Sequence, residues 1–181
     1  MERQIAFLRA INVGGHIVKM ERLRAIFESL GLANVETFIA SGNVVFAPAR
    51  GKVAVLERKI EEHLQKELGY DVKTFVRTNA ELAEIAEHRP PFDAARETPA
   101  TRLFIGFLPA EPSREAEAKL LGAASETDEF HLHGREIYWH CHVPANESKF
   151  YGAKLEKTLG MATTLRNVNT VRRLLAKYPP K

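Results

Sequence analysis

The chain has 181 residues, of which 45% are hydrophobic and 27% are charged. This composition excludes a disordered or fibrous chain and predicts a folded core. The single cysteine, Cys141, excludes an internal disulfide, and the first apolar run, residues 5–8, is too short for a signal peptide or a membrane span. We therefore expect a cytoplasmic protein without a membrane partner.

The formal net charge of +3 is unevenly distributed along the chain. Residues 149–181 contain eight basic side chains and one acidic side chain, so the rest of the chain is net acidic. Such segregation predicts a positive surface that faces an anionic ligand, a nucleic acid or an acidic partner. Solvated faces of two surface helices would explain the same pattern equally well.

The first half alternates strand and helix signals. Apolar runs and a turn at residues 41–43 predict a strand at 5–9 and a hairpin of strands 35–40 and 44–47, with a further strand at 72–77. Helical spacing of apolar residues predicts one helix that ends at Gly31 and another that ends at Gly69. Thr78 and Glu81 form a capping box, which predicts a third helix closed by the Pro90-Pro91 pair.

The second half repeats this order. It predicts strands at 102–108, 129–133, 136–142 and 162–166, with a hairpin turn at Gly134-Arg135. Ser113 is expected to cap a helix that runs to Leu121, and Ser148 a helix that stops at Gly160. A last helix is expected at 168–178.

The two halves also match where they end. Arg77-Thr78-Asn79 and the helix up to Pro91 align without a gap on Arg166-Asn167-Val168 and the helix up to Pro180. We interpret the chain as α+β, a tandem duplication of ferredoxin-like βαββαβ units with antiparallel sheets, each followed by a short helix. The expected subdomains are residues 1–92 and 100–181. Convergence on a common way of ending a helix is the alternative explanation.

Three polar segments follow strand ends and could bind an anion. The paired glycines of the first would let an anion approach the backbone near a helix N-terminus, but no dinucleotide or Walker motif is present. A turn that needs a positive φ is the preferred explanation of the first segment, and a tight hairpin turn explains every residue of the second. In the third segment a helix cap requires only Asn167. The candidate ligand-binding residues are Arg9, Asn12, Gly14, Gly15, Lys19, Ser41, Gly42, Asn43, Arg166, Asn167, Asn169 and Thr170.

These segments also resemble a known family. Residues 8–15 (LRAINVGG), 40–46 (ASGNVVF) and 166–171 (RNVNTV) resemble the three signature blocks of a bacterial family catalogued as domain of unknown function 1697. The resemblance extends from Ile5 to about Leu175 and implies the duplicated ferredoxin-like fold, but no reaction. The family usually has Gly where this chain has Ala10, and Trp where it has Val168.

Four histidines share one face of the second predicted hairpin. Strand alternation places His131, His133, His140 and His142 on one side, together with Glu129, Glu136 and Tyr138. Two imidazoles and a carboxylate at such spacing could share a divalent metal. A solvated face needs no ligand, however, so we expect metal binding there to be weak or absent, and we expect no cofactor.

No catalytic residue can be assigned. A GxSxG motif is absent, and Cys141 belongs to the apolar face of its strand, which predicts an unreactive core thiol. Our first hypothesis is a module that binds a phosphate-bearing or other anionic ligand, either a nucleotide or a nucleic acid. The alternatives are an enzyme acting on a phosphorylated or anionic small molecule, and a regulatory or scaffold protein that pairs through a sheet face. The oligomeric state is not predicted.

Overall fold

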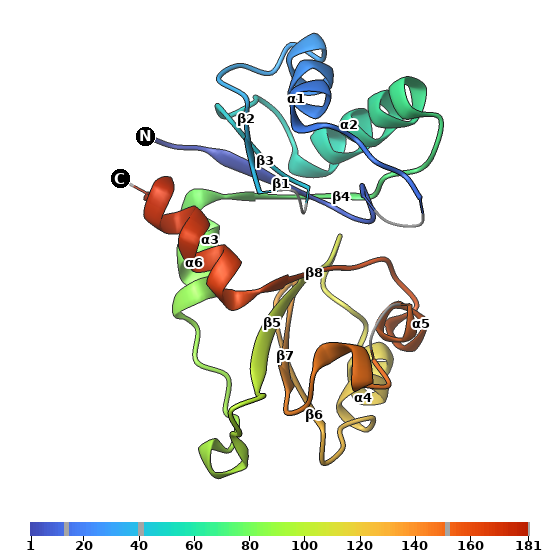
Figure 1. Cartoon of the computed structure of the whole chain (residues 1–181), viewed down its shortest axis with the longest axis vertical. Coiled ribbons are helices and arrows are strands. Elements are labelled where there is room, and N and C mark those ends of the chain that lie inside the picture. The colour runs from blue at the N-terminus through green and yellow to red at the C-terminus, as the bar shows by residue number, and fades with distance from the viewer. Residues whose placement is uncertain (13–14, 40–41, 151–152, 181) are drawn as a thin grey trace. The chain divides into compact units, whose positions relative to one another are not determined.

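The fold consists of two compact units. The structure, a computed structural model, describes residues 1–12, 15–39, 42–150 and 153–180. One unit comprises Met1–Ile85 with Arg173–Lys181, and the other comprises Ala86–Arg172. Each unit contains a four-stranded antiparallel sheet with helices on it (Figure 1), which confirms the expected α+β class.

The first unit contains a sheet of strand order β2-β3-β1-β4. Helices α1 and α2 lie on one face of this sheet (Figure 1). Its elements are β1 (Gln4–Leu8), α1 (Met20–Ser29), β2 (Glu36–Phe38), β3 (Asn43–Phe46), α2 (Val53–Leu68), β4 (Thr74–Thr78) and the beginning of α3 (Asn79–Glu87).

Strand β1 is central, and both of its faces are buried. Ala6 and Leu8 point toward the helices and pack in one core with Leu23 and Phe27 of α1. Successive side chains of a strand point to opposite faces, so the intervening residues of β1 lie on the other side of the sheet, and all five residues of the strand are buried. Burial on both faces explains why residues 5–8 of β1 form a continuous apolar run.

The second unit contains a sheet of order β6-β7-β5-β8, the same connectivity as in the first unit. Helices α4 and α5 lie on one face of it (Figure 1). Its elements are the 3₁₀ turn η1 (Ala94–Arg96), β5 (Arg102–Phe107), α4 (Arg114–Leu121), β6 (Asp128–His133), β7 (Glu136–Cys141), the 3₁₀ turn η2 (Ala145–Glu147), α5 (Lys154–Leu159), β8 (Thr164–Asn167) and the beginning of α6 (Val168–Lys177).

Most of the expected helix caps are present. The backbone N–H of Thr78 donates to Glu81 Oε2 (2.7 Å), and that of Glu81 donates to Thr78 Oγ1 (3.1 Å), as the capping box predicts. Ser113 accepts a hydrogen bond from the N–H of Ala116 at the start of α4. Among the helices that the structure describes, none is long and apolar enough to cross a bilayer.

The expected cap at Ser148 is wrong. Helix α5 begins only at Lys154, and its N-cap residue is Ala153. The Ser148 hydroxyl instead donates to the buried carboxylate of Asp128 (Oγ–Oδ1, 2.6 Å) and accepts from the N–H of Phe150. A buried acceptor distant in the sequence therefore determines the role of this serine.

The last residues of each expected repeat belong to the other unit. Residues 86–92 belong to the second unit, and Arg173–Lys181 belong to the first. There, Tyr178 Oη and Lys177 Nζ both donate to Glu36 Oε2 of strand β2, at 2.7 and 3.1 Å. The expected subdomains, 1–92 and 100–181, divide the chain by its sequence repeat, whereas the two units divide it by contacts. The expected boundaries therefore stay a prediction.

Candidate functional site

The first predicted segment forms a loop between β1 and α1. Asn12 Oδ1 accepts a hydrogen bond from the N–H of Val18 (2.7 Å), so this side chain closes the loop on itself. Arg9 is half-buried, and Gly15 adopts a φ of 89°, which favours glycine. Lys19 is exposed at the start of α1.

Ala10 has a φ of 57°, in the left-handed region. That conformation costs an alanine about 1 kcal/mol more than a glycine. A glycine at this position would therefore fit the backbone better.

The hairpin turn of the second segment contacts this loop. The N–H of Leu8 donates to the carbonyl of Gly42 (2.8 Å), and a Cβ on Gly42 would lie only 2.5 Å from Ile11 Cγ2. Asn43 is fully buried and donates from Nδ2 to the carbonyl of Phe38. The structure thus brings the first two segments together. The side-chain amides of Asn12 and Asn43 form hydrogen bonds within their own loops. Gly14 and Ser41 lie outside the described residues.

The third segment belongs to the second unit. Arg166 is buried and donates from Nη1 to Thr164 Oγ1 (2.8 Å) and to the carbonyl of Leu165 (2.9 Å), and burial lowers the pKa of its guanidinium to about 10. Asn167 caps α6, because its side chain accepts a hydrogen bond from the N–H of Asn169. Asn169 is exposed, and Thr170 is half-buried. Convergence of all three segments on one ligand stays a prediction.

The histidine-bearing face of the β6–β7 hairpin has the composition that strand alternation predicts. Glu129 lies opposite His140, and His131 lies opposite Tyr138, in the register of the two strands. Cys141 lies on the other face in the apolar core, and burial raises the pKa of its thiol.

The expectation of a solvated face is wrong for its C-terminal half. Tyr138, His140 and His142 are all buried. The segment between α3 and β5 supplies contacts to this face. The ring of Phe92 stacks on His140 with centroids 4.8 Å apart, and that of His88 stacks on His133 at 4.2 Å.

Glu129, His140 and His142 gather on this covered face. Their potential ligand atoms all lie within 4.8 Å of one another. Glu129 Oε2 is 2.7 Å from His142 Nε2 and 3.7 Å from His140 Nδ1. Desolvation lowers the pKa of His140, with a smaller contribution from His142, so the neutral imidazole is favoured.

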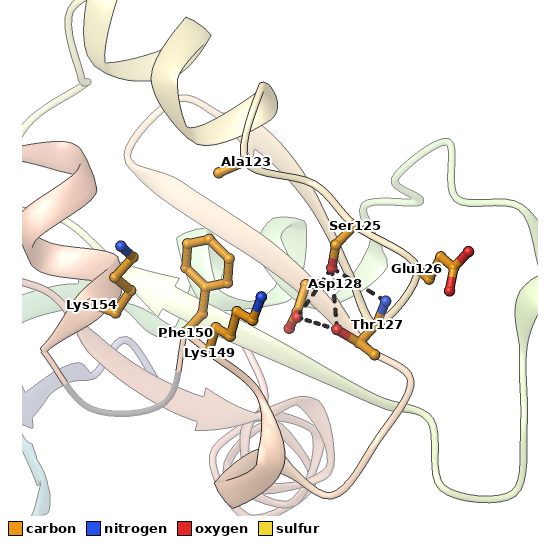
Figure 2. Close-up of a pocket in the computed structure, with 8 residues that line it drawn as sticks. All are labelled: Ala123, Ser125, Glu126, Thr127, Asp128, Lys149, Phe150 and Lys154. Atoms are coloured by element: carbon orange, nitrogen blue, oxygen red, sulfur yellow. Dashed lines mark hydrogen bonds between the residues drawn. The ribbon is translucent and has the colours of Figure 1, made fainter.

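A cavity of about 530 Å³ lies elsewhere in the second unit. Figure 2 shows Lys149, Phe150 and Lys154 on one side of it and Ser125, Thr127 and Asp128 on the other. Asp128 and Glu126, which also lines the cavity, offset the two lysines in charge. This cavity therefore does not favour an anion.

A second cavity, of about 540 Å³, lies in the first unit between the end of α1 and the start of α2. Its charged lining residues are Arg50, Lys52 and Lys59, and no acidic side chain lines it. Lys52 is the N-cap residue of α2 and makes no side-chain cap, and the first turn of that helix carries no acidic residue. The positive end of the helix dipole thus adds to three cationic side chains.

Sequence reasoning missed this cavity. The available signal was Arg50-Gly51-Lys52, a glycine between two basic residues directly before a helix. Leu30, the C-cap residue of α1, and Lys59 of α2 both line the cavity, so only the packing of α1 beside α2 completes it.

Comparison with known proteins agrees with this architecture. A solved structure described as a conserved bacterial protein from Streptococcus pneumoniae superposes with a TM-score of 0.72 and 23% identity, covering 99% of each chain. This likeness establishes a shared α+β fold with two antiparallel sheets. No curated protein matches the sequence.

The family profile described as "Protein of unknown function (DUF1697)" matches residues 1–138. The chain belongs to this family. The match includes the first two signature blocks, and the block at 166–171 lies beyond its end.

Proposed function

We propose that the protein binds a phosphate-bearing small molecule in the cavity between α1 and α2. The observation that supports this most is the charge of the lining, three basic side chains and no acidic one, in a cavity whose volume suits a nucleotide-sized ligand. Arg50 offers a planar fork for two phosphate oxygens, and the lysines offer compact charges.

A neighbouring hollow extends the same surface. It has a volume of about 260 Å³, shares Leu30 and Lys59 with the cavity, and adds Lys66. One acidic residue, Glu62, lines this extension. A ligand with more than one phosphate group could use both hollows, which favours a nucleoside polyphosphate over a single inorganic phosphate.

Titration with ATP in the absence of metal tests this proposal. K52A/K59A removes two exposed lysines from the cavity, and we expect the Kd measured by calorimetry to rise at least tenfold, because each lost charge contact contributes roughly 1–1.5 kcal/mol. The matched control K149A/K154A removes two exposed lysines from the net-neutral cavity. Equal losses in both variants would show binding by general surface charge and would contradict the proposal.

The three polar segments predicted from sequence remain a second candidate for the anion, with Arg9, Lys19 and Arg166 as its cations. Contact between the first two segments supports it. The hydrogen bonds of Asn12, Asn43 and Arg166 within the protein weaken it, because these groups already have partners.

We also infer that the two halves are duplicated ferredoxin-like units with repeat boundaries at 1–92 and 100–181. The identical order of strands in the two sheets supports this. So does the place of the two buried arginines: Arg77 pairs with Ile5 and Arg166 with Ile105, and each donates to the carbonyl of the residue before it.

A further inference from the structure

We propose that Glu129, His140 and His142 form a binding site for one divalent transition-metal ion, with zinc as the best candidate. The inference is independent of the anion site, which lies in the other unit. It rests on the donor set, on an unsatisfied buried nitrogen and on the residues that hold the ligands in place.

The donor set and its spacing suit zinc. Two imidazole nitrogens and one carboxylate oxygen are common ligands of this ion, which leaves a fourth position for water. Ligand atoms about 2.1 Å from a tetrahedral ion lie about 3.4 Å from each other. The distances from Glu129 Oε2 to the two histidine nitrogens, 2.7 and 3.7 Å, bracket this value. All three ligand atoms lie within 4.8 Å of one another, so rotation of the side chains would bring the donors onto one ion.

His140 provides the second observation. Its side chain is only 8% exposed, and its Nδ1 finds no hydrogen-bond partner among the residues that the structure describes. A buried polar atom left unsatisfied carries a cost that a ligand would remove. Oε2 of Glu129, the same atom that contacts His142, lies 3.7 Å from this nitrogen.

Neighbouring residues hold the other two ligands. Thr101 Oγ1 lies 3.1 Å from His142 Nδ1, so it fixes the ring and leaves Nε2 facing Glu129. Arg96 Nη1 binds Glu129 Oε1 at 2.7 Å and leaves Oε2 for the ion. Glu97, 3.8 Å from His140 Nε2, makes the surroundings net negative, because two carboxylates face one guanidinium.

The remaining histidines of this face do not offer an equivalent set. His88 and His131 use their Nε2 atoms on each other at 3.1 Å, and the ring of His88 stacks on that of His133. His131 therefore provides an internal comparison on the same hairpin, and His88 contacts it from the segment after α3.

The experiment measures zinc binding to full-length protein without a histidine tag, by competition with a chromogenic chelator and by calorimetry. We expect one site per chain, at least 100-fold weaker in H140Q and in E129Q and unchanged within threefold in H131Q. T101V keeps all three ligands and should weaken binding about tenfold to 100-fold through loss of positioning. Circular dichroism verifies that each variant is folded.

Two results would overturn the proposal. One is the absence of stoichiometric binding by the wild-type chain at micromolar zinc. The other is binding that survives in H140Q and E129Q but disappears in H131Q, which would place the metal at the His88 pair. If H140Q does not fold, E129Q and T101V decide the question, because they leave both histidines in place.

Discussion

The two units share a strand order but differ at their edge hairpins. The central strands correspond, because Ile5 and Ile105 each pair with the buried arginine of the neighbouring strand. The first hairpin has strands of three and four residues, whereas both strands of the second have six. The second hairpin and the residue after it carry four histidines, whereas the strands of the first hairpin carry none, so the two units differ most in this part of the sheet.

The same register places an aromatic residue at the corresponding position of each sheet. Phe46 of the first unit pairs with Gln4, and Trp139 of the second pairs with Phe104, so both aromatics occupy the corresponding place before the central isoleucine. Only Trp139 has an N–H to satisfy, and it donates to Asp128 Oδ1 at 2.8 Å. The buried carboxylate of Asp128 thus satisfies the Trp139 indole, and the ring of Phe46 needs no such acceptor.

The largest effect that we expect comes from breaking this pair. D128A leaves the Trp139 indole and the Ser148 hydroxyl without their buried acceptor and should cost about 3 kcal/mol of unfolding free energy. Urea unfolding followed by circular dichroism measures it. Adding W139F should recover part of the loss, because the unsatisfied N–H disappears. A double variant as unstable as the additive sum would contradict the pairing.

Removal of either buried arginine, Arg77 or Arg166, should destabilise the protein to a similar extent, because the two side chains occupy corresponding positions in the two sheets. R77A and R166A each remove a buried side chain that donates to a backbone carbonyl, so each should cost about 2 kcal/mol in urea unfolding. ATP affinity should not change in R166A. A stable R166A protein with weakened ATP binding would instead support the site predicted from the three polar segments.

The smallest effect distinguishes the two hairpin turns. G42A forces a side chain into a φ of 74° and within 2.5 Å of Ile11 Cγ2, whereas a Cβ at Gly134, with a φ of 57°, would meet nothing closer than 3.7 Å. A side chain at a positive φ destabilises both G42A and G134A. The free energy of unfolding of G42A should fall by about 1 kcal/mol more than that of G134A. Thermal unfolding of the two variants measures the difference, and equal losses would contradict the close contact.

The order of elements could be predicted from the sequence because its signals are local. The capping box at Thr78 and the left-handed glycine after α2, Gly69, act within a few residues, and both are found where expected. The face to which each hairpin side chain points also follows from alternation alone.

The environment of those side chains could not be predicted in the same way. His140 is buried because Phe92 stacks on it, and Ser148 leaves its expected cap because Asp128 accepts its hydroxyl. Each partner lies about 20 residues or more away in the sequence, and nothing local indicates which segment will cover a sheet face. The cavity of Arg50 depends likewise on the packing of two helices.

The membership of the chain ends in the two units bears on how the chain can be divided. Glu36 in the first unit contacts Lys177 and Tyr178 near the C-terminal end, and His131 in the second unit contacts His88, which precedes the expected boundary. A polypeptide cut at residue 92 would therefore lack both side chains that bind Glu36. A polypeptide that begins at residue 100 would lack the histidine beside His131.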